Sequence, residues 1–124
     1  MELMIESFDS YENTRATSSS ERISQRPVDL VHLARYTLGD AATEHEVLAL
    51  FRTQSQSLLR RLKENPDQAS RQRTAKTLKA SARGIGAWRV AMAAEQSDGL
   101  EGIQVLERRI DETNRFIGAL LGNA

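Results

Sequence analysis

The amino-acid sequence predicts an all-α fold, an up-down four-helix bundle with a short N-terminal helix and a polar N-terminal tail. Apolar residues recur every three or four positions through most of residues 28–121, which is the spacing of one face of an α-helix. β-Branched residues are scattered and never alternate with polar ones for long, so no strand is predicted. The connections between the periodic stretches are short, as between antiparallel neighbours in a bundle.

Length and composition limit the class of protein. The chain has 124 residues and no cysteine, so we expect one domain without disulfides or thiolate chemistry. It carries 17 basic and 17 acidic side chains, a balance that argues against a nucleic-acid-binding protein. No apolar run is long enough to span a bilayer, and the acidic N-terminus does not resemble a secretory signal. We therefore expect a cytoplasmic protein without membrane contact.

Two regions are predicted along the chain. Residues 1–27 are rich in Ser, Thr, Asn, Glu and Arg, and so few apolar residues predict a flexible N-terminal tail. Residues 28–124 hold the periodic stretches and are predicted to form the helical bundle.

The first two helices are predicted from their end signals. A short helix over residues 28–38 has Asp29 near its start and Gly39 as a C-terminal glycine cap. A second helix is expected to begin at Thr43, because Thr43 and Glu46 have the spacing of a capping box. Asn65 and Pro66 are expected to end it.

Three further helices are predicted in the second half of the chain. One covers about residues 66–83, and Gly84 and Gly86 mark a bend after it. An alanine-rich helix covers about residues 87–96, with Trp88 expected in the core. The last has the most regular pattern, with spacings of three and four that define an a/d face: Ile103, Leu106, Ile110, Thr113, Ile117 and Leu120.

The centre of the chain carries a motif. Residues 75–88 read AKTLKASARGIGAW. Its Leu78, Lys79, Ser81, Ala82 and Gly86-Ala87 match, in order, the signature of the histidine-containing phosphotransfer (HPt) family, which this segment resembles. In that family a histidine is followed by a lysine three residues on, a glycine four residues on and a Gly-Ala pair opening the next helix. Residues 28–30, 38–40 and 47–51 are similar to earlier parts of the same pattern.

The sequence departs from the family pattern at two positions. Lys76 stands where the resemblance implies the phosphorylated histidine, and Ala80 stands where it implies the glycine. A neutral imidazole can attack a phosphoryl group, whereas a lysine with a pKa near ~10.4 is protonated at neutral pH and has no lone pair to offer. Ala80 adds a methyl group where an approaching partner would need room. We expect no phosphorylation of this chain.

The resemblance implies a docking face without the reactive group. Positions three and four apart share one side of a helix, which predicts a cluster of Arg73, Lys76, Lys79, Ala80 and Arg83. In the family this side binds a response-regulator receiver domain, whose site is a pocket of carboxylates. We expect this chain to bind a receiver domain or a histidine kinase as a non-phosphorylatable adaptor or competitor in two-component signalling.

Two alternatives remain open at this level. The first alternative to the adaptor is an active phosphotransfer protein whose acceptor histidine was replaced by Lys76, and the second is a structural interaction bundle unrelated to phosphotransfer. No catalytic set, cofactor motif or metal-ligand spacing occurs in the sequence, so we expect a non-enzymatic protein. His32 and His45 are interpreted as ordinary surface or boundary histidines. One bundle can bury the last helix internally, so a monomer is expected.

Overall fold

The computed structural model describes residues 26–122, and every regular element within that range is an α-helix. The helices are α2 (Leu30–Tyr36), α3 (Ala41–Glu64), α4 (Gln68–Ile85), α5 (Trp88–Glu95) and α6 (Gly99–Leu121). The predicted all-α class is therefore confirmed for this part of the chain. The predicted tail, residues 1–27, lies outside the described residues except for Arg26 and Pro27.

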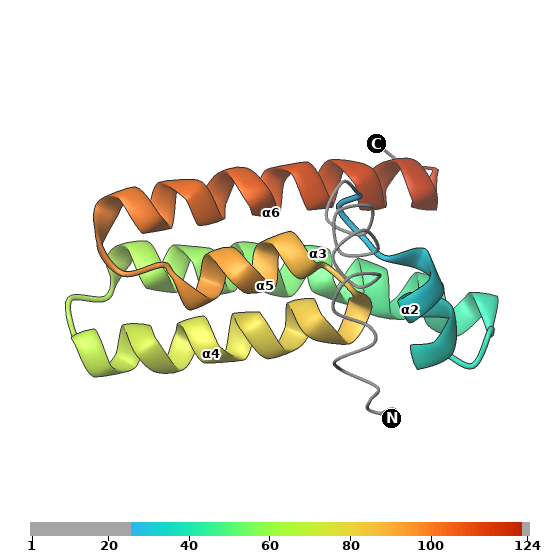
Figure 1. Cartoon of the computed structure of the whole chain (residues 1–124), viewed down its shortest axis with the longest axis horizontal. Coiled ribbons are helices and arrows are strands. Elements are labelled where there is room, and N and C mark those ends of the chain that lie inside the picture. The colour runs from blue at the N-terminus through green and yellow to red at the C-terminus, as the bar shows by residue number, and fades with distance from the viewer. Residues whose placement is uncertain (1–25, 123–124) are drawn as a thin grey trace, which may run out of the picture.

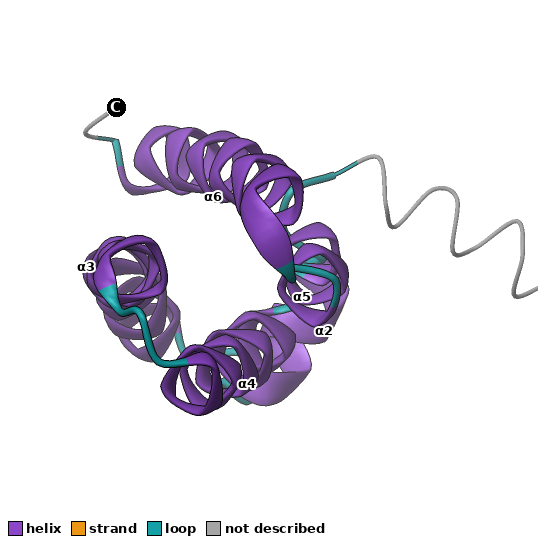
Figure 2. Ribbon diagram, turned by 90° about the vertical axis from the view of Figure 1, so that its left-hand side faces the viewer, coloured by secondary structure: helices purple, strands orange, loops and turns teal. Residues whose placement is uncertain are grey.

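Four helices surround a common interior. Successive helices from α3 to α6 run in opposite directions (Figure 1), and each of them packs against two of the others. Viewed from one end, α3, α4, α5 and α6 follow one another around the interior (Figure 2). The short α2 packs against α4. None of these helices in residues 26–122 combines the length and apolarity needed to cross a bilayer.

The interior is filled mainly by aliphatic side chains from every helix. The largest apolar side chains without access to solvent are Val28, Leu33, Leu78, Val90, Leu106, Ile110 and Ile117. Small residues pack among them, notably Ala82 on α4 and Ala91, Ala93 and Ala94 on α5. Removing such apolar area from water is the main favourable contribution to folding. The core therefore fixes which side of α4 is turned toward solvent.

Aspartates occupy the N-cap of four helices, three of them with a side-chain hydrogen bond, and one of them corrects a predicted boundary. The carboxylates of Asp29, Asp40 and Asp67 each accept a hydrogen bond from the backbone amide three residues later. The prediction that α3 begins at Thr43 is wrong, since the helix begins at Ala41 with Asp40 as its N-cap. Aspartate is at least as good an N-cap as threonine. Thr43 instead donates its hydroxyl to the Asp40 carboxylate.

The turn between α2 and α3 contains an unusual backbone conformation. α2 ends at Tyr36, earlier than predicted, and Leu38 has φ 56° while Gly39 has φ 74°. The Leu38 amide donates to the Arg35 carbonyl and the Gly39 amide to the Ala34 carbonyl, which is the Schellman pattern of a helix C-terminus. The leucine occupies the position where glycine is usual, at a cost of about 1–2 kcal/mol. The cap that was predicted for Gly39 thus begins one residue earlier.

The turn between α4 and α5 holds the residue that precedes α2. α4 continues past the predicted end at Arg83 to Ile85, because Ile85 is buried in the core. Gly86 then adopts φ 79°, and a Cβ atom placed there would lie 2.9 Å from the Cβ of Asp29. The Asp29 amide donates to the Gly86 carbonyl at 2.9 Å. Glycine is required here by both its conformation and this close approach.

Candidate functional site

The outer side of α4 carries the residues that the sequence singled out. Leu78 and Ala82 are fully buried and so define the inner side of this helix. Ala80 is two residues from each, about 160° around a helix with 3.6 residues per turn. It is exposed, as are Arg73, Lys76 and Arg83. We call these four residues the basic face.

The cations of the basic face are directed to solvent. Within residues 26–122, neither Lys76 nor Arg83 makes a hydrogen bond or an ion pair. Arg73 donates only to the hydroxyl of Ser70, at 3.0 Å. No carboxylate of the described residues therefore offsets these three charges at contact distance. Such a surface favours a partner that presents carboxylates or other anionic groups.

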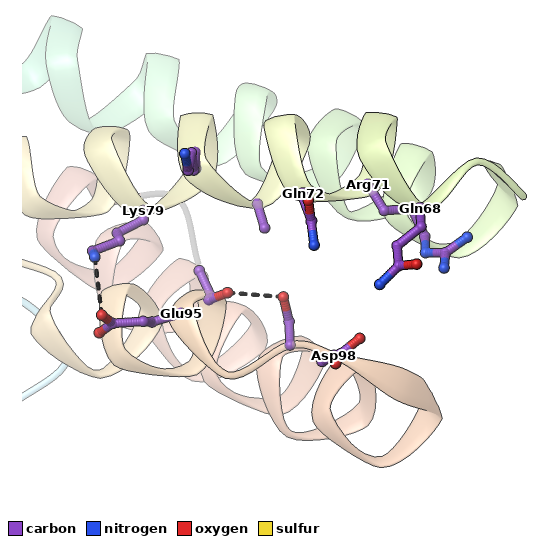
Figure 3. Close-up of a pocket in the computed structure, with 10 residues that line it drawn as sticks. Gln68, Arg71, Gln72, Lys79, Glu95 and Asp98 are labelled. Atoms are coloured by element: carbon purple, nitrogen blue, oxygen red, sulfur yellow. Dashed lines mark hydrogen bonds and ion pairs between the residues drawn. The ribbon is translucent and has the colours of Figure 1, made fainter.

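Lys79 lies at the edge of this surface and not within it. Its ammonium is 3.2 Å from a carboxylate oxygen of Glu95 on α5, and Figure 3 shows the pair bridging the two helices. A solvent-accessible ion pair of this kind contributes little to stability, but it turns the lysine toward α5. The structure thus brings together four of the five predicted residues and assigns the fifth to the contact between α4 and α5.

A groove of about 510 Å³ runs beside the basic face, between α4 and the segment that joins α5 to α6. It exists because α5 has 8 residues and α4 has 18, so the N-terminal half of α4 extends beyond its neighbour. Gln68, Arg71 and Gln72 of α4 lie opposite Asp98 (Figure 3). The lining contains no histidine or cysteine, and the one serine, Ser97, donates its hydroxyl to the Ala94 carbonyl at 2.8 Å. The groove therefore holds no pair of a nucleophile and a base.

An aromatic cluster at the C-terminal end of α4 was not predicted. The Trp88 indole donates to the Asp29 carboxylate at 3.0 Å, and the His32 ring meets Trp88 edge to face at 4.9 Å between centroids. Tyr36 stacks parallel to His32 at 6.4 Å, and its ring lies over Gly84. The one available signal is that the indole N–H of a partly buried tryptophan usually needs an acceptor. Nothing in the local sequence indicated an aspartate 59 positions away.

The two histidines have positions that fit ordinary boundary and surface residues. His32 is half-buried in the aromatic cluster, and His45 is exposed on the second turn of α3. Trp88, which was predicted in the core, is also half-buried. Within the part of the chain that the structure describes, no three His, Asp or Glu side chains are grouped to hold a metal ion.

Neither the protein-family models, nor the curated proteins, nor the solved structures contain a significant match to this chain.

Proposed function

We propose that this chain is an HPt-like signalling protein that binds a receiver domain, or a histidine kinase, without accepting phosphate. It acts as an adaptor or competitor in a phosphorelay. The proposal includes the finer fold class, an up-down four-helix bundle of α3 to α6 with α2 as the short N-terminal helix. The opposite directions of successive helices and their mutual contacts support that class.

One observation carries the proposal. Lys76 lies midway along α4 on the solvent side, where the motif resemblance implies an acceptor histidine, and no described residue neutralises it. A lysine ammonium donates hydrogen bonds but has no acceptor atom. The ammonium is attracted by a pocket of carboxylates, but it cannot accept a phosphoryl group that one of those carboxylates carries. The exposed position of Lys76 is thus suited to occupying such a pocket and blocking transfer.

Charge also supports a docking role for the rest of the face. Arg73 and Arg83 flank Lys76 at distances of three and seven residues along α4, so the three cations extend over about 15 Å of helix. Charges arranged in this way mainly raise the rate and specificity of association. The partner's rim should therefore be acidic as well as its pocket.

The binding test uses a matched pair of arginine variants. Arg83→Glu reverses a charge on the basic face, and Arg108→Glu makes the same change at an exposed position of α6 that forms no hydrogen bond or ion pair within residues 26–122. Calorimetric titration with each receiver domain of the source organism should give at least one Kd tighter than about 100 µM. Arg83→Glu should weaken that affinity about tenfold or more, and Arg108→Glu should leave it within about twofold. Failure of every receiver and kinase domain to bind would refute the proposal.

A second test separates docking from chemistry. Phosphorylated receiver is incubated with the unaltered chain, with Lys76→His and with Lys76→Gln, and phosphate on each chain is measured. We expect label on Lys76→His alone, since only that variant places an imidazole nitrogen on the basic face to receive the phosphoryl group from the aspartyl oxygen. Label on the unaltered chain would overturn the adaptor role.

A further inference from the structure

Leu38 is placed unfavourably in two respects. Its backbone is in the left-handed region, and within residues 26–122 it is the one residue other than glycine with a positive φ. Its side chain is also 92% exposed, so apolar contacts within the described part of the chain do not compensate for that conformation. Glycine or asparagine would serve the turn better. Uncompensated backbone strain of this kind is typical of functional positions.

Among the other exposed apolar side chains, those of Tyr36 and Leu50 lie at the same end of the molecule. Tyr36 is 58% exposed and rests on Gly84, one turn after Ala80 of the basic face. Leu50 is 55% exposed and lies one turn before Gln54, whose side-chain oxygen accepts a hydrogen bond from Ser81 of α4 at 3.2 Å. Because α3 and α4 run in opposite directions, Leu50 lies near the level of Ile85. We call Tyr36, Leu38 and Leu50 the apolar corner.

The apolar corner and the basic face are parts of one surface. Tyr36 contacts α4 at Gly84, which lies one turn after Ala80 on the same side of the helix, so the ring adjoins the basic face at Ala80. The two parts make different demands on a partner. The cations require carboxylates, and the corner requires an apolar area beside them that can enclose a leucine side chain.

We propose that Leu38 is an anchor for the receiver-type partner, inserted into an apolar surface that borders the partner's carboxylate pocket. This inference rests on the proposed function and adds the second half of the recognition surface. The backbone conformation of the turn projects the leucine outward, and binding removes it from water. The left-handed backbone conformation of Leu38 thus lowers the stability of the free protein, and the burial of its side chain raises the affinity of the complex.

The test uses Leu38→Asn and, as a matched control, Leu100→Asn. Asparagine tolerates the left-handed conformation and is polar, so Leu38→Asn should raise the denaturation midpoint while weakening receiver affinity about tenfold. Leu100 is also an exposed leucine, at 74%, but it lies in the first turn of α6, away from both parts of the surface. Its variant should leave the Kd within about twofold. A purely structural role for Leu38 would not give higher stability together with lower affinity.

The outcomes separate the two proposals. If the unaltered chain binds a receiver and Leu38→Asn binds equally well, the anchor is refuted and the adaptor function stands. If neither a receiver nor a kinase domain binds the unaltered chain, both are refuted; if a kinase domain alone binds it, the anchor is refuted and the adaptor function stands. If light scattering shows that the unaltered chain self-associates and Leu38→Asn does not, the corner binds a second copy of this chain and the anchor assignment is wrong.

Discussion

At the scale of single residues, Asp40 shows how local chemistry decides where a helix begins. The spacing of Thr43 and Glu46 predicted that α3 begins at Thr43, with no role for Asp40 as its cap. In the structure the Asp40 carboxylate accepts hydrogen bonds from both the amide and the hydroxyl of Thr43. An earlier cap adds three residues to α3, each with its own backbone hydrogen bond, and so the longer helix is preferred.

The Asp40 cap gives a pH-dependent prediction. The hydrogen bond from the Thr43 hydroxyl, and next the one from its amide, hold the pKa of Asp40 below its ordinary value of 3.8. Because the folded-state pKa is the lower one, the stabilisation is fully present above about pH 5 and is lost as the pH falls through the folded-state value. Asparagine caps without titrating. The free energy of unfolding of the unaltered chain, relative to Asp40→Asn, should therefore decrease between pH 6 and pH 2 in urea titrations.

The matched control for this prediction is Asp111→Asn. It removes an exposed carboxylate of α6 that forms no hydrogen bond or ion pair within residues 26–122. Its stability should run parallel to that of the unaltered chain across the same pH range. If the free energy of unfolding of Asp40→Asn also changed with pH in parallel with that of the unaltered chain, the cap would contribute nothing to acid sensitivity.

At the scale of elements, α6 follows its sequence pattern in the middle and departs from it at the end. Leu106, Ile110, Thr113 and Ile117 are buried as the a/d spacing predicted. Leu120 belongs to the same pattern and yet is 43% exposed. Next to Thr113, Asn114 donates to the Ser55 hydroxyl of α3 at 3.1 Å, a partly buried polar contact that the apolar spacing did not indicate. Periodicity gives the side of a helix that faces inward, but not how far along its length the core extends.

Two substitutions on α6 measure this difference. Ile110→Ala should lower the free energy of unfolding by about 2–5 kcal/mol, because it leaves a cavity at a fully buried position. Leu120→Ala should change it by less than about 0.5 kcal/mol. Denaturant unfolding followed by circular dichroism gives both values. Equal losses would show that Leu120 is packed as tightly as Ile110.

At the scale of the whole molecule, a contact between distant residues closes the fold. Asp29 caps α2, donates its amide to the carbonyl of Gly86, and accepts the indole N–H of Trp88. These bonds join the start of the described chain to the turn between α4 and α5. They hold Tyr36 over Gly84 and thus place the apolar corner beside the basic face.

Substituting glycines at two helix ends tests this closure. Gly86 and Gly122 both have a positive φ, at 79° and 76°, but a Cβ atom would meet Asp29 at Gly86 and nothing within 4 Å at Gly122. Gly122→Ala should cost about 1 kcal/mol for its conformation. Gly86→Ala should cost about 1–3 kcal/mol more, because the backbone of Asp29 must move. Trp88 fluorescence should shift in the folded state of Gly86→Ala alone, and an unshifted spectrum would argue against the closure.

The linear sequence was sufficient to predict the all-helical class, the number and order of the helices in residues 26–122, and the inward direction of Leu106, Ile110 and Ile117. Those features depend on spacing along one helix, which a linear sequence records directly. The three-dimensional structure was needed to show that Lys79 pairs with Glu95, that Trp88 meets Asp29 and that Leu38 projects into solvent. These depend on the packing of segments far apart in the chain, and the residue types alone do not specify which of many compatible partners lies within contact distance.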